Sequence, residues 1–492
     1  MSELFLPVAM LRELFSAPGL VVLVPLVAAG GLGFVADARL GGWINAGAAT
    51  LAFLLACALP WEGRAGLLLL VDPLAAYMAI LTSFVAMTTA WYSQRYMQIE
   101  LEAGRFDAPR LRVLHALIQA MLGALLLALL ANAVPVTWGA LEAATIASVL
   151  AVALSRTQEA ARACSRQLVL CGVGLAMAFF GTTVLYLAAV PALGSGLAAM
   201  SWSRLPDAAP AMQAGMLNLA FVFLLLGYGT KAGLLPLGAW VTDSQQAGKL
   251  PVSAVLSGAI LNVALVVILR LRGLVDANPD AIAAGPPIMA LGLASLLLAA
   301  FSLGGQREVT RFFAVSTIAQ SGVAAFAFGL GGPAATFAGL LQLAVHTLTR
   351  TAVLQSLGAA VQLKGGPCFA DIGGLLLRHR ALGLTLGAGM LALAGLPPFG
   401  LFVTFYLLLT DTVGDMPWLA APLALGLLVA GGAMAVRLLG LWLGPSTPDR
   451  GPPPGLALLL PAWVQLALVL VLGLAMPGPV TDWLTAIAWA AP

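Results

Sequence analysis

The sequence has 492 residues, of which 61% are hydrophobic and only 9% are charged. Its mean hydropathy of +1.01 lies far outside the range of soluble globular domains, which excludes that class of fold. The net charge of +3 is small for this length and argues against a nucleic-acid partner. The chain is therefore predicted to be an integral membrane protein.

Apolar runs long enough to cross a hydrocarbon core of about 30 Å recur along the chain, and no segments alternate in polarity as β-barrel strands do. We therefore expect an all-α membrane protein with 14 transmembrane helices. The runs lie at 19–35, 44–60, 70–92, 114–132, 134–155, 167–190, 211–236, 251–272, 287–305, 309–331, 332–356, 381–410, 417–444 and 457–476. Residues 95–112 are an expected interfacial segment, and 444–455 a Pro/Gly-rich linker.

The basic residues predict how these helices are oriented, because short cytoplasmic loops are enriched in Lys and Arg. Of the 23 Lys and Arg residues, 15 fall on one side of the membrane, five on the other and three inside spans. Both termini are therefore expected on the side away from the cytoplasm. No basic, apolar leader with a small-residue cleavage site is evident, so we expect the first run to be retained.

The few ionisable residues inside apolar runs are the candidates for function, since such a group at mid-membrane costs at least about 2.5 to 3.5 kcal/mol. Lys231 is one of only three lysines. A lysine can take up and release a proton, whereas an arginine stays charged. Glu142 is its expected partner, because a nearby carboxylate keeps both groups charged. A lysine that reaches the membrane surface and a purely structural ion pair are the alternatives.

His346 and Arg350 are four residues apart and therefore share one helix face. Histidine titrates near neutrality and suits a proton relay, whereas Arg350 would act as a fixed charge. A packing role for the histidine stays open. The role of Arg437 is left open: the candidates are an ion pair with Asp411 or Asp415, or a guanidinium that reaches an end of its helix.

Prolines interrupt two runs at comparable places, in GLLPLG (233–238) and GLPPFG (395–400). Proline removes a backbone donor and frees a carbonyl, so each helix should break at Pro236 and at Pro397 and Pro398. Taken singly, each would be an ordinary kink. As a pair they indicate internal repeats with functional sites at the breaks.

No motif for a metal, a cofactor or a nucleophile is evident, so we expect no active site, metal or cofactor in this chain itself. The cysteines lie far apart without ligand spacing, and packing is their expected role. They are Cys57, Cys164, Cys171 and Cys368.

Several segments resemble the antiporter-like subunits shared by respiratory complex I, Mrp antiporters and membrane-bound group 4 nickel-iron hydrogenases. The longest is GYGTKAGLLPLGAWVTDSQQAGKLPVSAVLSGAILNVALVVILR, which begins at Gly227. The resemblance is narrowed to the component F group of hydrogenase-4 by DPLAAYMAILTSFVAMTTAWYSQRYM, WGALEAATIASVLAVALSRT, LCGVGLAMAFFGTTVLYLAA and LALAGLPPFGLF. It covers roughly residues 70 to 410.

The resemblance implies two inverted five-helix repeats and a proton path along charged residues at mid-membrane. Glu142 matches the glutamate of span 5, Lys231 the lysine of the broken span 7, and His346 a histidine of span 11. The implied divisions are 1–113 (the first three spans and the interfacial segment), 114–272 (first repeat), 287–444 (second repeat) and 445–492 (linker and last span).

Several positions depart from the pattern that the resemblance implies. Gly238 replaces a histidine, Asn262 a bridging lysine, Ala319 and Gln320 a Glu-His pair, Gln342 a histidine, Arg350 a lysine and Phe405 an acid. Arginine holds a charge without passing a proton, and the other replacements do not titrate. The first half of the charge relay is therefore expected to survive, and most of the second half is not.

Three functions are consistent with the sequence. The first is an antiporter-like membrane subunit of a group 4 nickel-iron hydrogenase or complex I-like assembly, which couples redox chemistry elsewhere to proton translocation. The second is a degenerate structural or coupling subunit, and the third is the membrane partner of an inorganic-carbon uptake complex. The expected partners are other membrane subunits and, indirectly, a hydrogenase or redox arm, in a bacterial inner membrane.

Overall fold

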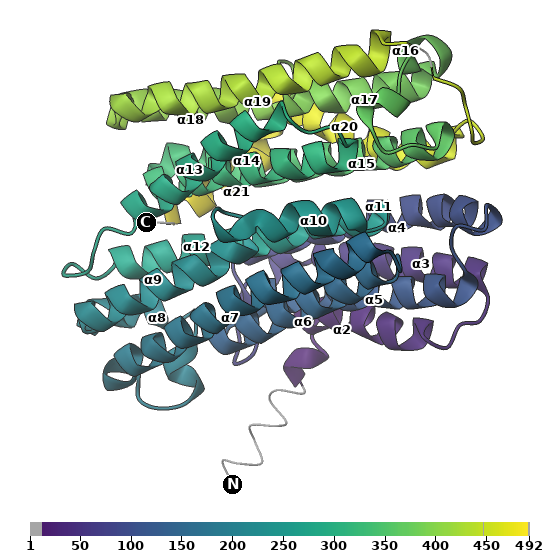
Figure 1. The fold of residues 1–492 in the computed structure, drawn as a ribbon. Coiled ribbons are helices and arrows are strands. Elements are labelled where there is room, and N and C mark those ends of the chain that lie inside the picture. Colours follow the sequence, from purple (N-terminus) through teal and green to yellow (C-terminus); the bar gives the residue numbers. More distant parts are fainter. Residues whose placement is uncertain (1–11, 446, 491–492) are drawn as a thin grey trace.

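The computed structural model describes residues 12–445 and 447–490, and long helices lying side by side make up almost all of it (Figure 1). Among these residues, 12 helices are long and apolar enough to cross a membrane. Two shorter apolar helices, Ala17–Leu32 and Arg380–Leu393, overlap the two remaining expected runs, and the second covers only the part of run 381–410 before its break. The all-α membrane fold is thus confirmed, whereas the total of 14 spans stays a prediction.

Helices α2 to α12 form the lower part of the bundle in Figure 1. The long ones are α2 (Ala17–Leu32), α3 (Ala38–Ala56), α4 (Pro73–Glu102), α5 (Ala108–Leu130), α6 (Val134–Ala153), α7 (Gln158–Leu193), α9 (Ala214–Lys231) and α12 (Leu261–Asp276). The short elements are η1 (Leu59–Trp61), η2 (Leu197–Met200), α8 (Leu205–Ala208), η3 (Ala209–Ala211), η4 (Leu237–Ala239), α10 (Trp240–Ala247), α11 (Leu250–Val255) and the π-helical turn η5 (Leu256–Ile260). A small antiparallel pair, β1 (Arg64–Ala65) and β2 (Leu70–Val71), precedes α4.

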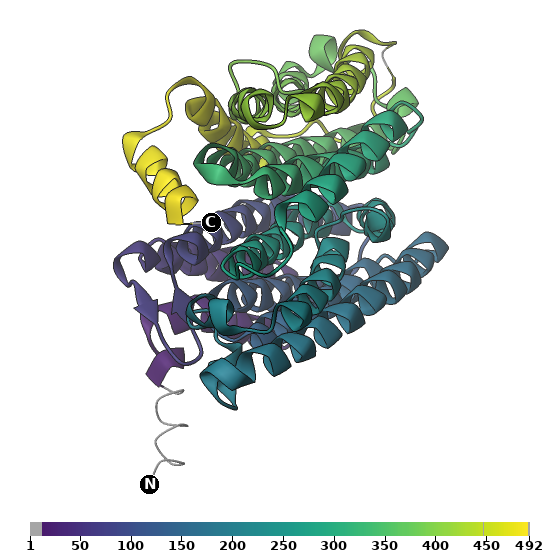
Figure 2. The ribbon, with the colours of Figure 1, turned by 90° about the vertical axis from the view of Figure 1, so that its left-hand side faces the viewer.

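Helices α13 to α20 form the upper part, which Figure 2 shows seen along the bundle. They are α13 (Gly285–Leu303), α14 (Val309–Leu330), α15 (Gly332–Lys364), α16 (Leu375–Arg378), α17 (Arg380–Leu393), α18 (Gly400–Asp415), α19 (Pro417–Leu443) and α20 (Leu456–Leu474), with the turn η6 (Phe369–Asp371). The last helix is α21 (Gly478–Ala490).

Side-chain caps and special backbone residues set several helix ends. Asp72 accepts a hydrogen bond from the N–H of Ala75 (2.7 Å) at the start of α4, and Thr157 does so from Ala160 (3.0 Å) at the start of α7. Gly365, with a φ of 78°, ends α15 in the left-handed region that glycine adopts without strain.

The helices differ sharply in burial. The segment Leu250–Asp276 together with α14 and α15 is almost wholly buried, whereas α3, α19 and α20 keep large apolar side chains exposed. A helix that is apolar all round and buried belongs to the centre of a membrane protein. The central helices are therefore the ones whose polar residues need explanation.

Both expected interruptions occur with the same backbone geometry. Helix α9 ends at Lys231 and α17 ends at Leu393, and Gly233 and Gly395 then take φ values of 75° and 74°. The N–H of the residue after each glycine donates to a carbonyl five residues earlier, at 2.9 Å in the first break and 3.2 Å in the second. Only glycine enters this conformation readily, so the glycines end the helices and the prolines prevent them from resuming at once.

Candidate functional site

The structure brings the two principal candidates together. The Lys231 side chain is only 1% exposed, and its Nζ lies 3.7 Å from Oε2 of Glu142. The same nitrogen donates a hydrogen bond of 2.6 Å to Oγ1 of Thr145. Glu142 and Thr145 are three residues apart on α6, so one helix face presents both oxygens to the lysine.

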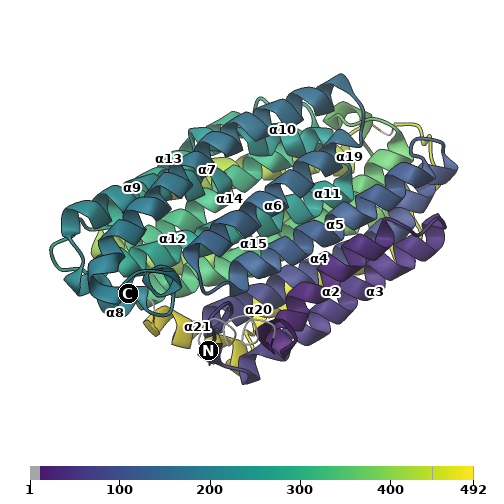
Figure 3. The same cartoon turned by 90° about the horizontal axis from the view of Figure 1, so that it is seen from below.

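Glu142 lies at the surface of the bundle. Its side chain is 31% exposed, and its Oε2 accepts no hydrogen bond from a described residue. The exposed neighbours Ile146 and Leu150 continue the same outward face of α6, which lies beside α7 on the lower side of the bundle (Figure 3). A carboxylate therefore interrupts an otherwise apolar outer surface, and the ion pair reaches from the interior to that surface.

Hydrogen bonds to backbone groups and a close backbone contact fix the helix break beside Lys231. The indole N–H of Trp240 donates to the carbonyl oxygen of Thr230 (2.9 Å), and the N–H of Leu235 donates to Oγ of Ser295 on α13 (3.0 Å). A Cβ atom at Gly238 would lie 2.1 Å from the carbonyl oxygen of Gly233. This backbone therefore has no room for a side chain at Gly238.

A buried polar chain extends inward from α6. Gln167 donates to Oγ of Ser148 and accepts from Oγ of Ser244, both at 2.8 Å. Gln245, which follows Ser244 on α10, accepts a close hydrogen bond from Nη2 of Arg350. Sequence reasoning missed Thr145, Gln167 and Gln245. The signal available was their polarity within or beside spans whose other residues are apolar.

His346 and Arg350 are both buried in α15. Among the described residues, Nε2 of His346 has no hydrogen-bond partner, and neither do Nε and Nη1 of Arg350. No carboxylate of the described residues forms an ion pair with Arg350. The two residues share a helix face as predicted, but no direct contact joins them to Lys231 or Glu142 within the described part of the chain.

Neutral hydrogen bonds hold three of the positions that the resemblance marks as departures, namely Asn262, Gln320 and Gln342. Asn262 donates to Oγ1 of Thr347 (2.8 Å). Gln342 donates to Oε1 of Gln320 (2.6 Å) and accepts from Oγ1 of Thr404 at the same distance. Amides and hydroxyls thus fill this region without a titratable group.

Phe405 packs into the second helix break, and Arg437 donates hydrogen bonds to backbone carbonyls. A Cβ atom at Gly395 would lie 2.3 Å from the Phe405 ring, so this ring fills the second break. Arg437 donates to the carbonyl oxygens of Gly304 (3.2 Å) and Gln306 (2.6 Å). Of the alternatives left open for Arg437, an ion pair with Asp411 or Asp415 is not formed among the described residues, and the guanidinium reaches the α13–α14 connection.

The structure also describes the cysteines and the potential metal ligands. All four cysteines are free, with Cys164 and Cys171 buried. Among residues 12–445 and 447–490, no group of three or more His, Cys, Asp or Glu side chains is placed to hold a metal ion.

A bundle of membrane-spanning helices holds a buried lysine at the end of a broken helix, and comparisons with known proteins place the chain among antiporter-like membrane proteins. The family model described as NADH:quinone oxidoreductase/Mrp antiporter, TM matches residues 131–431, more than half of the chain. The chain belongs to this family and is a multi-pass integral membrane protein.

Individual relatives agree with this assignment. A hydrogenase-4 component F homolog of Methylacidiphilum infernorum is 40% identical over 464 residues, which cover 94% of this chain and 97% of the relative. The resemblance drawn from the sequence segments is therefore confirmed.

Two solved structures share the fold at low sequence identity. A chain of the membrane-bound sulfane sulfur reductase, an archaeal respiratory membrane complex, matches with a TM-score of 0.84 and 20% identity, covering 96% of this chain and 97% of that one. A chain of the Mrp complex from Dietzia sp. DQ12-45-1b matches with a TM-score of 0.80 and 19% identity, with the same coverage. Both matching chains are subunits of multi-subunit membrane complexes.

Proposed function

We propose that this chain translocates protons as an antiporter-like subunit of a group 4 nickel-iron hydrogenase or complex I-like assembly, driven by redox chemistry elsewhere in that assembly. The observation that carries the proposal is the Lys231–Glu142 pair, with 3.7 Å between Nζ and Oε2 at the end of a broken helix. The proposed setting is a bacterial inner membrane, with both termini on the periplasmic side.

The pair can act as a switch on the proton of Lys231. While Glu142 lies close, the carboxylate stabilises the charged ammonium group. If Glu142 moves away, Lys231 becomes a buried cation without a counter-charge, which is strongly unfavourable. The lysine then releases its proton, and the hydroxyl of Thr145 can still accept a hydrogen bond from the remaining amine.

The exposed position of Glu142 supports a role for a neighbouring subunit in moving this carboxylate. A charged or polar side chain of a partner that packs against α6 would reach the exposed part of the Glu142 side chain, which is 31% exposed, whereas the buried Oε2 faces Lys231. The two structural matches are subunits of membrane complexes, which fits such an arrangement. The partner's charge would then set whether Glu142 stays with Lys231.

The proposed architecture is a pair of inverted repeats, 114–272 and 287–444. The matching backbone of the two helix breaks supports this division, since both have a left-handed glycine three residues before a proline.

A structural or coupling subunit without transport is the second candidate. The observation that favours it is the neutral set of Gln320, Gln342 and Thr404, which holds hydrogen bonds but carries no titratable group. Proton transfer through this region would have to proceed through water.

The deciding experiment measures proton flux in proteoliposomes of the purified native assembly. Lys231→Ala and Glu142→Ala should each abolish coupled flux while the assembly stays intact, because either change removes the switch. Lys364→Ala is the matched control, since it removes another buried lysine, which pairs with Asp449 at the end of α15. Normal flux in both test variants would leave the structural role as the remaining explanation.

A further inference from the structure

Unpaired polar atoms gather on two helices of the bundle. Seventeen buried side-chain nitrogen and oxygen atoms of the described residues have no hydrogen-bond partner, and eleven of them belong to α4 or α15. They are in Thr89, Tyr92 and Ser93 of α4, and in Thr336, His346, Arg350, Thr351, Gln355 and Gln362 of α15. Buried polar atoms are almost always satisfied in proteins, by other groups or by ordered water, so this concentration requires an explanation.

Helices α4 and α15 lie side by side in parallel, and their register follows from three hydrogen bonds. Tyr77 donates to the carbonyl oxygen of Leu340 (3.0 Å) near the start of both helices. Near their ends, Gln362 donates to the carbonyl oxygen of Tyr96 (3.1 Å) and to Oε1 of Glu100 (2.9 Å). The paired residues are 262 to 266 positions apart throughout, so one register holds over the whole interface.

This register places the unpaired atoms opposite one another. A Cβ atom at Gly358 would lie 2.2 Å from the hydroxyl oxygen of Tyr92, so these two residues are in contact. Gln355, one turn before Gly358 on the same face of α15, then lies opposite Thr89 and Tyr92. Neither nitrogen nor oxygen of the Gln355 amide has a partner, and neither has the Tyr92 hydroxyl. Facing polar groups that do not reach each other are the setting in which buried water bridges protein atoms.

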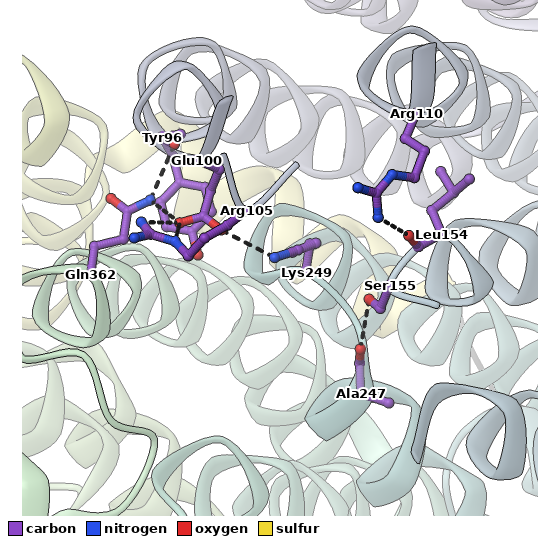
Figure 4. Close-up of polar contacts among 9 residues, drawn as sticks. All are labelled: Tyr96, Glu100, Arg105, Arg110, Leu154, Ser155, Ala247, Lys249 and Gln362. Carbon is purple, nitrogen blue, oxygen red and sulfur yellow. Dashed lines mark hydrogen bonds and ion pairs between the residues drawn. The ribbon is translucent and has the colours of Figure 1, made fainter. Parts of the chain in front are cut away.

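The outer end of this interface is a charged cluster at the Arg/Lys-rich end of the bundle. Glu100 is 4% exposed, and its carboxylate accepts hydrogen bonds from Arg105 (2.7 Å), Lys249 (3.1 Å) and Gln362 (2.9 Å). Figure 4 shows these three side chains converging on Glu100. Arg105 is 48% exposed, so the cluster connects the end of the interface to solvent.

The unpaired atoms that extend inward from the charged cluster along α15 reach Thr351, which directly follows Arg350, and the Arg350 guanidinium itself turns to Gln245 of α10. Thr351 has an unpaired hydroxyl and is the chain neighbour of Arg350, whose Nε and Nη1 are unpaired as well. A guanidinium group cannot lose its charge inside a protein, and a buried charge without an acid partner needs polar contacts. One turn earlier, His346 has an unpaired Nε2. Water at this point would solvate the arginine and reach the histidine.

We propose that a file of water molecules fills the α4–α15 seam, defined as Thr89, Tyr92, Ser93, Thr351, Gln355 and Gln362, and connects Glu100 to Arg350 and His346. Hydration of the seam stands independently of the function proposed above, whereas its use as a proton path rests on that function. Along the file, each proton hop breaks one O–H bond and forms the next. The path ends on the free imidazole nitrogen of His346 and is separate from the helix break at Lys231.

Radiolytic hydroxyl labelling of the intact assembly tests the hydration directly, because buried side chains are labelled where ordered water touches them. Tyr92 is 1% exposed, yet we expect labelling well above that of Phe326, which is equally buried in apolar surroundings. The label at Tyr92 should fall several-fold in Gln355→Leu. Labelling of Tyr92 no stronger than that of Phe326 would overturn the proposal.

Proton flux in the same preparations tests the use of the path. Gln355→Leu and Tyr92→Phe should each lower flux several-fold. Gln119→Leu, the same change at another buried glutamine on α5, should leave it unaltered. If Gln355→Leu fails to assemble, Tyr92→Phe decides, since it removes a single oxygen. Loss of flux in Lys231→Ala together with normal flux in both seam variants would reject the proton path alone. Normal flux in Lys231→Ala would reject the proposed function, and the labelling of Tyr92 would still decide the hydration.

Discussion

The two helix breaks share a backbone and differ in chemistry. In each, a left-handed glycine follows the helix end by two residues, with φ values of 75° at Gly233 and 74° at Gly395. The last helical residue is Lys231 in the first break and Leu393 in the second, and the Phe405 ring fills the second. Glycine and proline therefore determine that a membrane helix breaks, whereas the residue at the helix end determines whether the break can hold a charge.

The largest expected effect comes from giving the second break the residue of the first. Leu393→Lys should prevent assembly, because Leu393 is 3% exposed and a buried ion without a partner costs several kcal/mol, on the order of 3 to 5. The yield of intact complex in gel filtration measures this effect. Leu393→Met is the control for side-chain shape. A full yield of the lysine variant would show that the second break is already solvated and can hold a charge as the first one does.

An intermediate effect is expected at the glycines that lie five residues after each left-handed glycine. A Cβ atom at Gly238 would lie 2.1 Å from a backbone oxygen of Gly233, whereas one at Gly400 would meet a side-chain atom of Val345 at 2.6 Å. Gly238→Ala should therefore destabilise the protein by about 1 to 3 kcal/mol, and Gly400→Ala by less, because a side chain yields more readily than backbone. Thermal unfolding of the two variants compares them, and equal losses would contradict the packing described for the first break.

The smallest effect is expected at Asp449, which forms ion pairs with Lys364 at the end of α15 and with His379. Hydrogen bonds from Lys364 and then His379 hold the pKa of the Asp449 carboxyl below its ordinary value. A lowered pKa in the folded state contributes stability above the unfolded-state pKa, and this contribution disappears as pH falls through the folded-state pKa. Asp449→Asn should therefore cost less than about 1 kcal/mol at pH 7, and this cost should disappear as the pH falls through the lowered pKa of the folded state.

Thermal unfolding as a function of pH measures that contribution, and Asp415→Asn is the control at an exposed acid. A difference between wild type and Asp449→Asn that persists at acid pH would point to packing of the linker as its cause, and not to the ion pairs.

The breaks could be anticipated from sequence because they depend on local chemistry, and the Lys231–Glu142 pair because few other ionisable residues lie inside apolar runs. Proline and glycine act on their own segment, and a lone lysine such as Lys231 stands out in an apolar run. The length of a helix was harder to predict from sequence. Helix α7 extends from Gln158 to Leu193, beyond its apolar run 167–190, because helix ends outside the hydrocarbon region can be polar.

Contacts between distant helices could not be anticipated. The register of α4 against α15 joins residues more than 260 positions apart, and nothing in either segment alone fixes it. The same limit explains why the role of Arg437 stayed open. Its actual acceptors are backbone carbonyls of Gly304 and Gln306, which carry no signal in a sequence.

The outward position of Glu142 affects the chain before it joins any complex. A carboxylate that is 31% exposed on an apolar surface faces hydrocarbon whenever no protein covers α6. A solitary copy in the bilayer is therefore less stable than an assembled one, because the face of α6 that carries Glu142 is then uncovered. Unassembled copies would be the first to unfold and be degraded, so the residue proposed to control the proton would also help to match the amount of this protein to that of its neighbours.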